Sequence, residues 1–114
     1  MLRSLLILAA LIPADRVLAQ EATVATETYR CDRGAMVTAT YLNLGDRSFA
    51  VLGFEGRQMG FEVDISASGA RYVAREGTEP FVWWTKGSDA MLLHGQGDAE
   101  AIVYSGCRTL PPLP

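Results

Sequence analysis

Residues 59–65, with the sequence Met-Gly-Phe-Glu-Val-Asp-Ile, show the clearest strand pattern in the chain. Their apolar side chains occupy every second position, and Gly60, Glu62 and Asp64 lie between them. Because successive side chains of a strand point to opposite faces, this pattern predicts a half-buried β-strand. Alternation also predicts strands at residues 37–41 and 71–75, and the aromatic and β-branched residues 81–85 favour another.

Glycine-containing turns separate the predicted strands, for example at Gly45, Gly56 and Gly77. After the first 19 residues, apolar residues do not recur at helical spacing for three full turns. About eight short strands, spaced about ten residues apart, predict an all-β domain over residues 28–109, a small antiparallel barrel or sandwich. We expect residues 20–27 to form a flexible lead-in and the proline-rich tail 110–114 to be frayed.

Residues 1–19 have the pattern of a secretory signal peptide. Arg3 precedes the apolar core 5–12, and the small residues at 17–19 form a cleavage site before Gln20. The apolar run is too short to span a bilayer, and no cysteine near the cleavage site offers a position for a lipid. We therefore expect an exported, soluble, periplasmic protein without a stable membrane anchor; an uncleaved anchor is the alternative.

The chain contains two cysteines, Cys31 and Cys107. In an exported chain they predict a disulfide, which would close a loop of 77 residues and stabilise the fold by roughly 4 to 5 kcal/mol. Free thiols and a metal site are the alternatives. Two cysteines so far apart, with His94 as the only histidine, lack the ligand spacing of a zinc site, so we expect no metal and no cofactor.

The net charge of the domain indicates which class of partner it can bind. Residues 1–19 carry Arg3, Arg16 and Asp15, so the remainder holds 8 basic and 12 acidic residues and a net charge of −4. An acidic domain with one lysine and scattered arginines does not suit nucleic acid, whose phosphates need a basic face. It suits a basic partner, which opposite net charge would attract. The sequence gives no indication of the oligomeric state.

Residues for catalysis are not gathered in any recognisable motif. His94 ends a predicted strand, and Ser68, Asp89 and His94 lack the surrounding pattern of a hydrolase triad. Glu62 and Asp64 share one strand face and could form a carboxylate pair, but a solvent-exposed face is the simpler explanation of their position. We therefore expect a protein that is not an enzyme.

Two segments carry a family resemblance. Residues 66–72 read Ser-Ala-Ser-Gly-Ala-Arg-Tyr and residues 81–87 read Phe-Val-Trp-Trp-Thr-Lys-Gly. Tyr-Arg-Cys at 29–31 precedes them and Gly-Cys at 106–107 follows. Together they resemble the MliC/PliC family of bacterial inhibitors of c-type lysozyme, over about residues 29–107. The resemblance implies an eight-stranded antiparallel barrel with one disulfide, and a c-type lysozyme, generally a strongly basic protein, as the partner.

The resemblance also implies a binding site. In this family two loops enter the lysozyme cleft, and a serine before glycine and a lysine before glycine contact the enzyme. These roles match Ser68 and Lys86. Four further residues are expected as secondary contacts: Gly69, Arg71, Tyr72 and Trp84.

The chain departs from the family pattern in two places, a longer loop at 73–80 and Ser88 between Gly87 and Asp89, and we expect both to influence how Lys86 is presented. Of Trp83 and Trp84, alternation predicts that they point to opposite faces, with one packed in the core. The alternative function is a non-enzymatic envelope barrel that binds another ligand or has a structural role. It would require an unfilled apolar interior and would tolerate the loss of Lys86.

Overall fold

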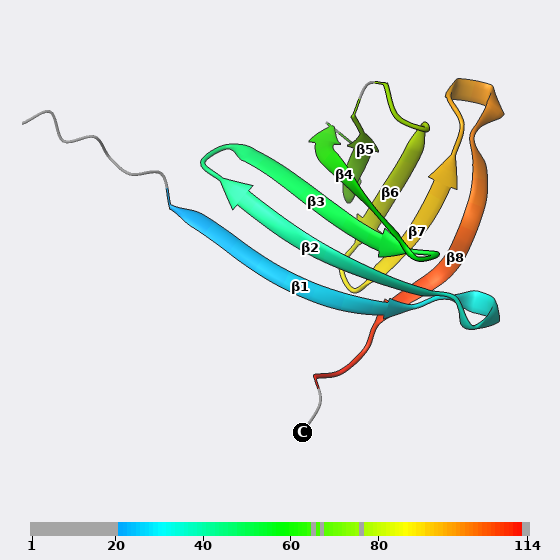
Figure 1. Ribbon diagram of the computed structural model, residues 1–114, viewed down its shortest axis with the longest axis horizontal. Helices are drawn as coiled ribbons and strands as arrows, with labels where there is room; N and C mark the ends of the chain where they lie inside the picture. Colours follow the sequence, from blue (N-terminus) through cyan, green and yellow to red (C-terminus); the bar gives the residue numbers. More distant parts are fainter. Residues whose placement is uncertain (1–20, 65, 67, 76, 113–114) are drawn as a thin grey trace, which may run out of the picture.

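The computed structural model describes residues 21–112 except 65, 67 and 76, so the expected signal peptide lies outside the described residues. Within them, eight antiparallel strands form a closed barrel in which each strand pairs with the next and β8 pairs with β1 (Figure 1). The all-β, eight-stranded barrel is thereby confirmed. The strands are β1 Ala22–Arg30, β2 Met36–Leu44, β3 Arg47–Phe54, β4 Arg57–Asp64, β5 Ala70–Ala74, β6 Phe81–Lys86, β7 Asp89–His94 and β8 Ala101–Thr109. Two short 3₁₀ helices, η1 Asp32–Gly34 and η2 Gly97–Ala99, complete the elements.

The first strand starts earlier than expected. Residues 22–27 were predicted as part of a flexible lead-in, and that prediction is wrong, because β1 pairs with β2 from Ala22↔Leu44 onward. Threonine side chains join the two strands, with Asn43 Nδ2 donating to Thr23 Oγ1 at 3.1 Å. Threonine is β-branched and suits a paired strand, and pairing with β2 orders a segment whose local sequence does not predict a strand.

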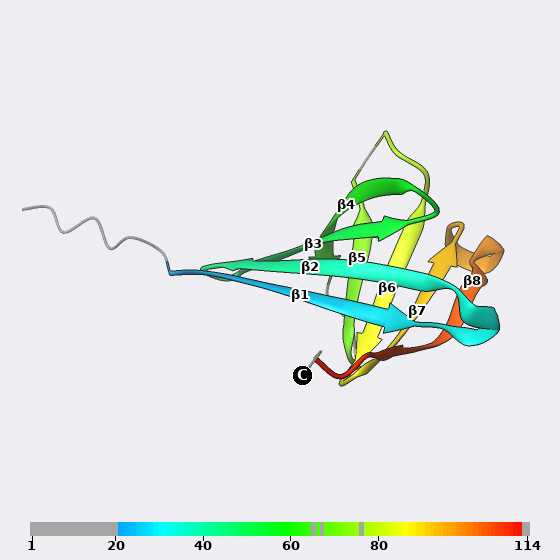
Figure 2. The same ribbon diagram turned by 60° about the horizontal axis from the view of Figure 1, so that its bottom comes forward.

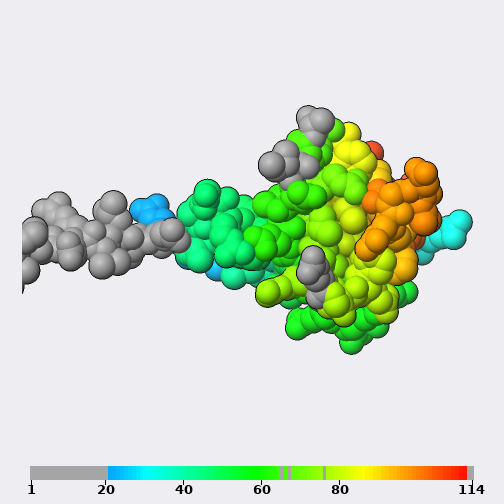
Figure 3. Space-filling view, turned by 90° about the horizontal axis from the view of Figure 1, so that it is seen from above, coloured from blue at the N-terminus to red at the C-terminus, as the bar shows by residue number. Residues whose placement is uncertain are grey.

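The β1–β2–β3 sheet extends beyond the point where the barrel closes. Only Tyr29 and Arg30 of β1 pair with β8, whereas all of Ala22–Arg30 pairs with β2. The extension projects to one side of the barrel in Figures 1 and 2. In the space-filling view it forms a narrow cyan and green projection (Figure 3). One wall of the barrel mouth is therefore longer than the others.

Large side chains fill the barrel interior. Trp83 is fully buried, and its ring lies edge-on to Tyr29, with centroids 5.0 Å apart. Trp84, its neighbour on β6, is half-buried and lies on the outer face, which confirms that the two tryptophans point to opposite faces. The other largest side chains with less than 2% exposure are Phe61, Leu52, Leu92, Val37 and Cys107. Eight strands enclose about the volume that such side chains occupy.

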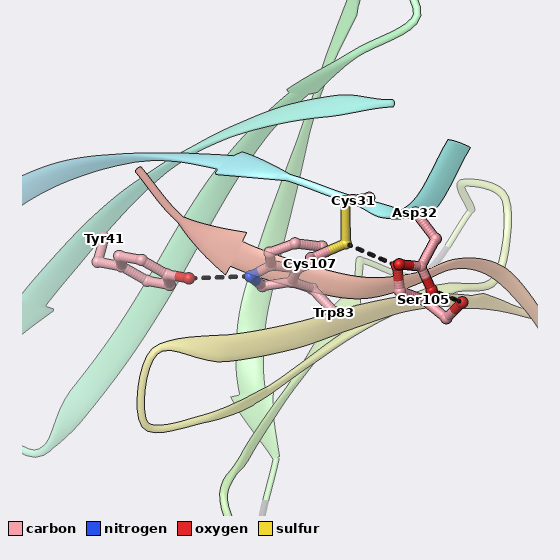
Figure 4. Close-up of a disulfide and its surroundings, with 6 residues drawn as sticks. All are labelled: Cys31, Asp32, Tyr41, Trp83, Ser105 and Cys107. Carbon is pink, nitrogen blue, oxygen red and sulfur yellow. Dashed lines mark hydrogen bonds between the residues drawn. A yellow bond between two sulfur atoms is a disulfide. The ribbon is translucent and has the colours of Figure 1, made fainter. Parts of the chain in front are cut away.

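A disulfide joins the two ends of the barrel sequence. Cys31 follows β1 and Cys107 lies in β8, 76 positions later, and their sulfurs are bonded (Figure 4). Beside the bond, the Ser105 hydroxyl donates to Asp32 Oδ2 at 3.1 Å. The predicted disulfide is confirmed, and it reinforces the short β1–β8 seam. No helix in the described part of the chain has the length and hydropathy needed to cross a membrane.

Candidate partner-binding site

The segments that contain Ser68 and Lys86 lie at the same end of the barrel. Ser68 lies in the connection between β4 and β5, and Lys86 ends β6 just before the turn to β7. Because β5 and β6 are antiparallel, the start of β5 lies beside the end of β6, with Ala70 paired to Thr85. Figure 2 shows the β6–β7 turn beside the start of β5, while the β5–β6 connection lies at the opposite end.

Trp84 connects both predicted residues. Its indole Nε1 donates a hydrogen bond to the backbone oxygen of Ser68 at 2.9 Å. The Lys86 ammonium lies over the same indole, 4.7 Å from the ring centroid. An ammonium above an aromatic face is attracted by the ring's negative potential. The Trp84 side chain, on the outer face of β6, therefore contacts both the Ser68 loop and the Lys86 ammonium.

The serine loop has a local turn of its own. The Ser66 hydroxyl donates to the backbone oxygen of Ser68 at 2.7 Å and accepts from the Ser68 amide at 3.3 Å. The backbone N–H and C=O of Ser68 are thus both engaged, whereas the exposed Ser68 hydroxyl has no hydrogen-bond partner among the described residues. That hydroxyl remains available as both a donor and an acceptor toward a partner.

Gly69 allows the loop to approach β6 closely. Its φ of +68° lies in the region that favours glycine, and a Cβ at this position would overlap the Thr85 carbonyl and lie 2.7 Å from Lys86 Cγ. A side chain here would push the loop away from the strand. Gly69 is therefore a structural requirement of the site, in addition to the contact role expected from the sequence.

A second cation lies near Trp84. The guanidinium of Arg71, which pairs with Trp84 across β5 and β6, lies 5.1 Å from the ring centroid. Its Nη2 also forms an ion pair with Glu100 Oε2 at 2.8 Å, and both side chains are about three-quarters covered. Sequence reasoning identified Arg71 but missed Glu100, because the pair links residues 29 positions apart.

Tyr72 lies apart from the outer cluster. It is on the inner face of the barrel with 8% exposure, and its ring contacts Tyr41 at a centroid distance of 5.5 Å. Because side chains alternate along a strand, Arg71 lies on the outer face of β5 and Tyr72 on the inner face. Tyr72 thus faces the barrel mouth rather than the surface that carries Lys86 and Trp84.

Beside Lys86 the outer surface is hollowed. A hollow of about 230 Å³ is lined by residues of β6, β7 and β8, among them Trp84, Lys86, Met91 and Arg108. Asp89, opposite Lys86 across the turn, forms an ion pair with Arg108, whose Nε lies 3.6 Å from Asp89 Oδ1. The neighbourhood of Lys86 is therefore partly apolar and carries charges of both signs.

The two departures from the family pattern lie in different places. The connection 75–80 joins the far end of β6, about 17 Å along the strand from Lys86, so this loop does not adjoin Lys86. Gly87 and Ser88 together form the two-residue connection between β6 and β7, with Lys86 paired to Asp89. Ser88 therefore belongs to the turn that follows Lys86.

The residues considered for catalysis are not brought together. His94 ends β7 at the far end of the barrel, where its Nε2 lies 3.7 Å from Glu79 Oε2. Asp89 begins the same strand at the Lys86 end. Glu62 forms an ion pair with Arg47 at 2.7 Å. Ser68, Asp89 and His94 therefore cannot act as a triad.

Known proteins with similar sequences are described as lysozyme inhibitors. Residues 29–101 match the family model for the membrane-bound lysozyme-inhibitor of c-type lysozyme. A membrane-bound lysozyme inhibitor of C-type lysozyme from Pseudomonas aeruginosa is 43% identical over 81 residues, which cover 70% of this chain and 61% of the relative. One from Cupriavidus necator is 32% identical over 84 residues, covering 73% and 64%. The chain thus spans about three fifths of the length of these curated relatives.

Solved structures show the same fold. Pseudomonas aeruginosa MliC, in a crystal structure of its complex with hen egg white lysozyme, is 35% identical, with a TM-score of 0.60 over 80% of this chain and 86% of that chain. PliC-St, the periplasmic lysozyme inhibitor of C-type lysozyme from Salmonella typhimurium, is 22% identical, with a TM-score of 0.68 over 78% of this chain and 100% of that chain, and supports the fold alone. By the family match over residues 29–101, the chain belongs to the MliC family of lysozyme inhibitors.

Proposed function

We propose that this protein inhibits c-type lysozyme by inserting the Ser68 loop and the β6–β7 turn into the substrate cleft of the enzyme. The observation that carries the proposal is the convergence of Ser68 and Lys86 on the Trp84 indole, at one end of the barrel. Family membership supports lysozyme as the target. So does the relative solved in complex with hen egg white lysozyme. The protein then acts as a plug and performs no chemistry of its own.

The chemistry of the cleft explains why serine and lysine suit this role. Lysozyme cleaves sugar chains with two carboxyl groups that face each other, one protonated and one ionised. The Ser68 hydroxyl accepts from the protonated group and donates to the ionised one. The Lys86 ammonium pairs with the ionised carboxylate, and this charge-assisted bond strengthens when the contact expels water. The inhibitor thereby engages the catalytic groups and excludes substrate.

The acidic character of the domain favours encounter with such an enzyme. Apart from residues 1–19 the net charge is −4, and c-type lysozymes are generally basic. Opposite charges raise the association rate, and added salt reduces the effect. The alternative function, an apolar ligand carried inside the barrel, has less support, because Trp83, Phe61 and Leu52 fill the interior.

We also propose that the protein is exported and works in the periplasm. The signal-like pattern of residues 1–19 supports export. The Cys31–Cys107 disulfide agrees with it, since disulfides persist in oxidising compartments. Fractionation of cells that produce the full chain tests this proposal, with recovery in the periplasmic fraction as the expected result.

Residual lysozyme activity tests the inhibition. Oxidised protein lacking residues 1–19 is titrated into hen egg white lysozyme acting on bacterial cell walls. We expect saturable inhibition near one-to-one, weakened about thirtyfold by Lys86→Ala and about fivefold by Ser68→Ala. Arg75→Ala is the matched control, since it removes an exposed cation that directly follows β5 at the opposite end. Full inhibition by the Ser68→Ala/Lys86→Ala double variant would rule out the cleft-plugging mechanism.

A further inference from the structure

A second concave surface lies at the same end of the barrel, on the inner side of β6. This hollow, which we name the mouth hollow, has a volume of about 530 Å³. Its lining includes Tyr29, Tyr41, Tyr72, Glu27, Thr85 and Ser88. The projecting part of β1 and β2 forms one wall, and the β6–β7 turn forms part of the opposite wall. The mouth hollow therefore adjoins the proposed lysozyme-binding loops.

The tyrosines of the mouth hollow are held in place by contacts with one another and with Trp83. The hydroxyls of Tyr29 and Tyr41 lie 2.7 Å apart, within hydrogen-bond distance. Trp83 Nε1 donates to the Tyr41 hydroxyl at 2.9 Å, as Figure 4 shows. Tyr41 also contacts the Tyr72 ring, with an angle of 50° between the planes. The floor is therefore a set of aromatic groups fixed before any partner binds.

The electrostatic character of the mouth hollow suits a cation. Burial raises the pKa of Tyr29, Tyr41 and Tyr72 above the ordinary tyrosine value, so the floor stays neutral at physiological pH. Glu27 is the charged residue in the lining, two positions from Tyr29 on the same face of β1. Its carboxylate has no ion pair among the described residues. The mouth hollow thus combines an unpaired carboxylate with aromatic rings.

We infer that the mouth hollow receives an arginine side chain of the lysozyme, whose guanidinium pairs with Glu27 and contacts the tyrosine rings. The inference rests on the proposed function and extends its interface. A guanidinium suits such a site because it is planar, always charged and able to stack on aromatic rings while it pairs with a carboxylate. A neutral donor would gain less from Glu27 than a cation does, and an anionic group would be repelled.

The two faces of β6 adjoin groups of opposite charge. Lys86 lies on the outer face and can pair with an anion. Thr85 lies on the inner face and lines the mouth hollow, where Glu27 of β1 can pair with a cation. A partner that satisfies both must present a carboxylate and an arginine on the two sides of the same edge. This pairing of opposite charges raises specificity beyond what Ser68 and Lys86 provide, because a partner with one charge alone leaves the other group unpaired.

The dissociation constant for hen egg white lysozyme tests the inference. We compare the wild-type protein with Glu27→Gln and with Glu21→Gln, a matched control whose exposed carboxylate precedes β1 and is not part of the mouth hollow. We expect Glu27→Gln to weaken binding about threefold to fivefold, and Glu21→Gln to leave it unchanged. The penalty of Glu27→Gln should disappear when the arginines of the lysozyme are blocked with 1,2-cyclohexanedione. It should persist when its lysines are acetylated.

The outcomes separate this inference from the proposed function. If wild-type protein inhibits lysozyme and Glu27→Gln binds as tightly as wild type, the inference is overturned and the proposed function stands. If the penalty of Glu27→Gln survives arginine modification, the arginine assignment is overturned. If wild-type protein neither binds nor inhibits lysozyme, both are overturned. Thermal unfolding of each variant shows whether a change in affinity comes from a loss of folded protein.

Discussion

The indole Nε1 of Trp84 donates a 2.9 Å hydrogen bond to the backbone oxygen of Ser68, sixteen positions earlier in the chain. The bond joins β6 to the loop between β4 and β5. The same indole lies beneath the Lys86 ammonium, so its position fixes both groups that we propose to contact lysozyme. The geometry of the proposed site therefore depends on Trp84.

Replacing Trp84 by phenylalanine tests this dependence. Trp84→Phe keeps an aromatic face for Lys86 but removes the N–H group that holds Ser68. We expect a loss of about 1 kcal/mol in the free energy of unfolding and about fivefold weaker lysozyme binding. Urea denaturation and titration calorimetry measure the two effects. Unchanged affinity would show that the Ser68 loop is held without the indole.

Gly69 provides a second test, because two physical effects meet at this residue. Gly69→Ala places a side chain at φ +68° and against the Thr85 carbonyl, and we expect destabilisation by about 2 to 3 kcal/mol. Gly77→Ala is the matched control, since Gly77 also has a positive φ, +84°, but a Cβ there would meet nothing within 4 Å. It should lose about 1 kcal/mol. Urea denaturation compares them, and equal losses would contradict the steric argument.

Removing the disulfide is expected to weaken the barrel at its shortest seam. β1 and β8 pair through two residues each, and the Cys31–Cys107 bond lies beside them. We expect the Cys31→Ala/Cys107→Ala variant to lose about 2 to 5 kcal/mol of unfolding free energy. Guanidinium denaturation of the variant and of the wild-type protein, each with and without reductant, measures the loss. A reductant effect that persists in the variant would point to a cause other than this bond.

The sequence predicted the strands wherever one face is apolar and the other polar. Residues 59–64 and 71–74 follow this pattern and lie in β4 and β5. The start of β1 was not predicted, because residues 22–27 are exposed on both faces. Neither face packs on the core, so the segment has no alternation of apolar and polar residues. That segment is a strand because β2 pairs with it, and pairing between distant residues is not visible in local sequence.

The candidate site was predicted in part, for a similar reason. Ser68 and Lys86 stand beside glycines at strand ends, which is a local signal. The opposite orientation of Trp83 and Trp84 follows from alternation, but which of the two packs inside depends on the whole barrel. The ion pair of Arg71 with Glu100 and the hydrogen bond of Trp83 to Tyr41 join distant positions. Only the closed barrel brings these residues together.

The tyrosines of the mouth hollow make the stability of the protein sensitive to alkali. Burial raises the pKa of Tyr29, Tyr41 and Tyr72 above the unfolded value of 10.0. Between the unfolded and folded pKa values the native state binds more protons, so the free energy of unfolding falls as pH rises. It should be unaffected by these groups below about pH 10 and decline above it, by up to about 1.4 kcal/mol per pH unit for each tyrosine.

Urea denaturation at a series of pH values between about 8 and 11 measures this decline. Tyr41→Phe removes the tyrosine whose pKa is raised furthest and leaves the ring contact with Tyr72. It should lower the stability at neutral pH by about 1 kcal/mol, through the loss of its hydrogen bonds with Tyr29 and Trp83, and flatten the alkaline decline. A decline of the same steepness in the wild-type protein and in Tyr41→Phe would show that ionisation of other groups controls alkaline unfolding.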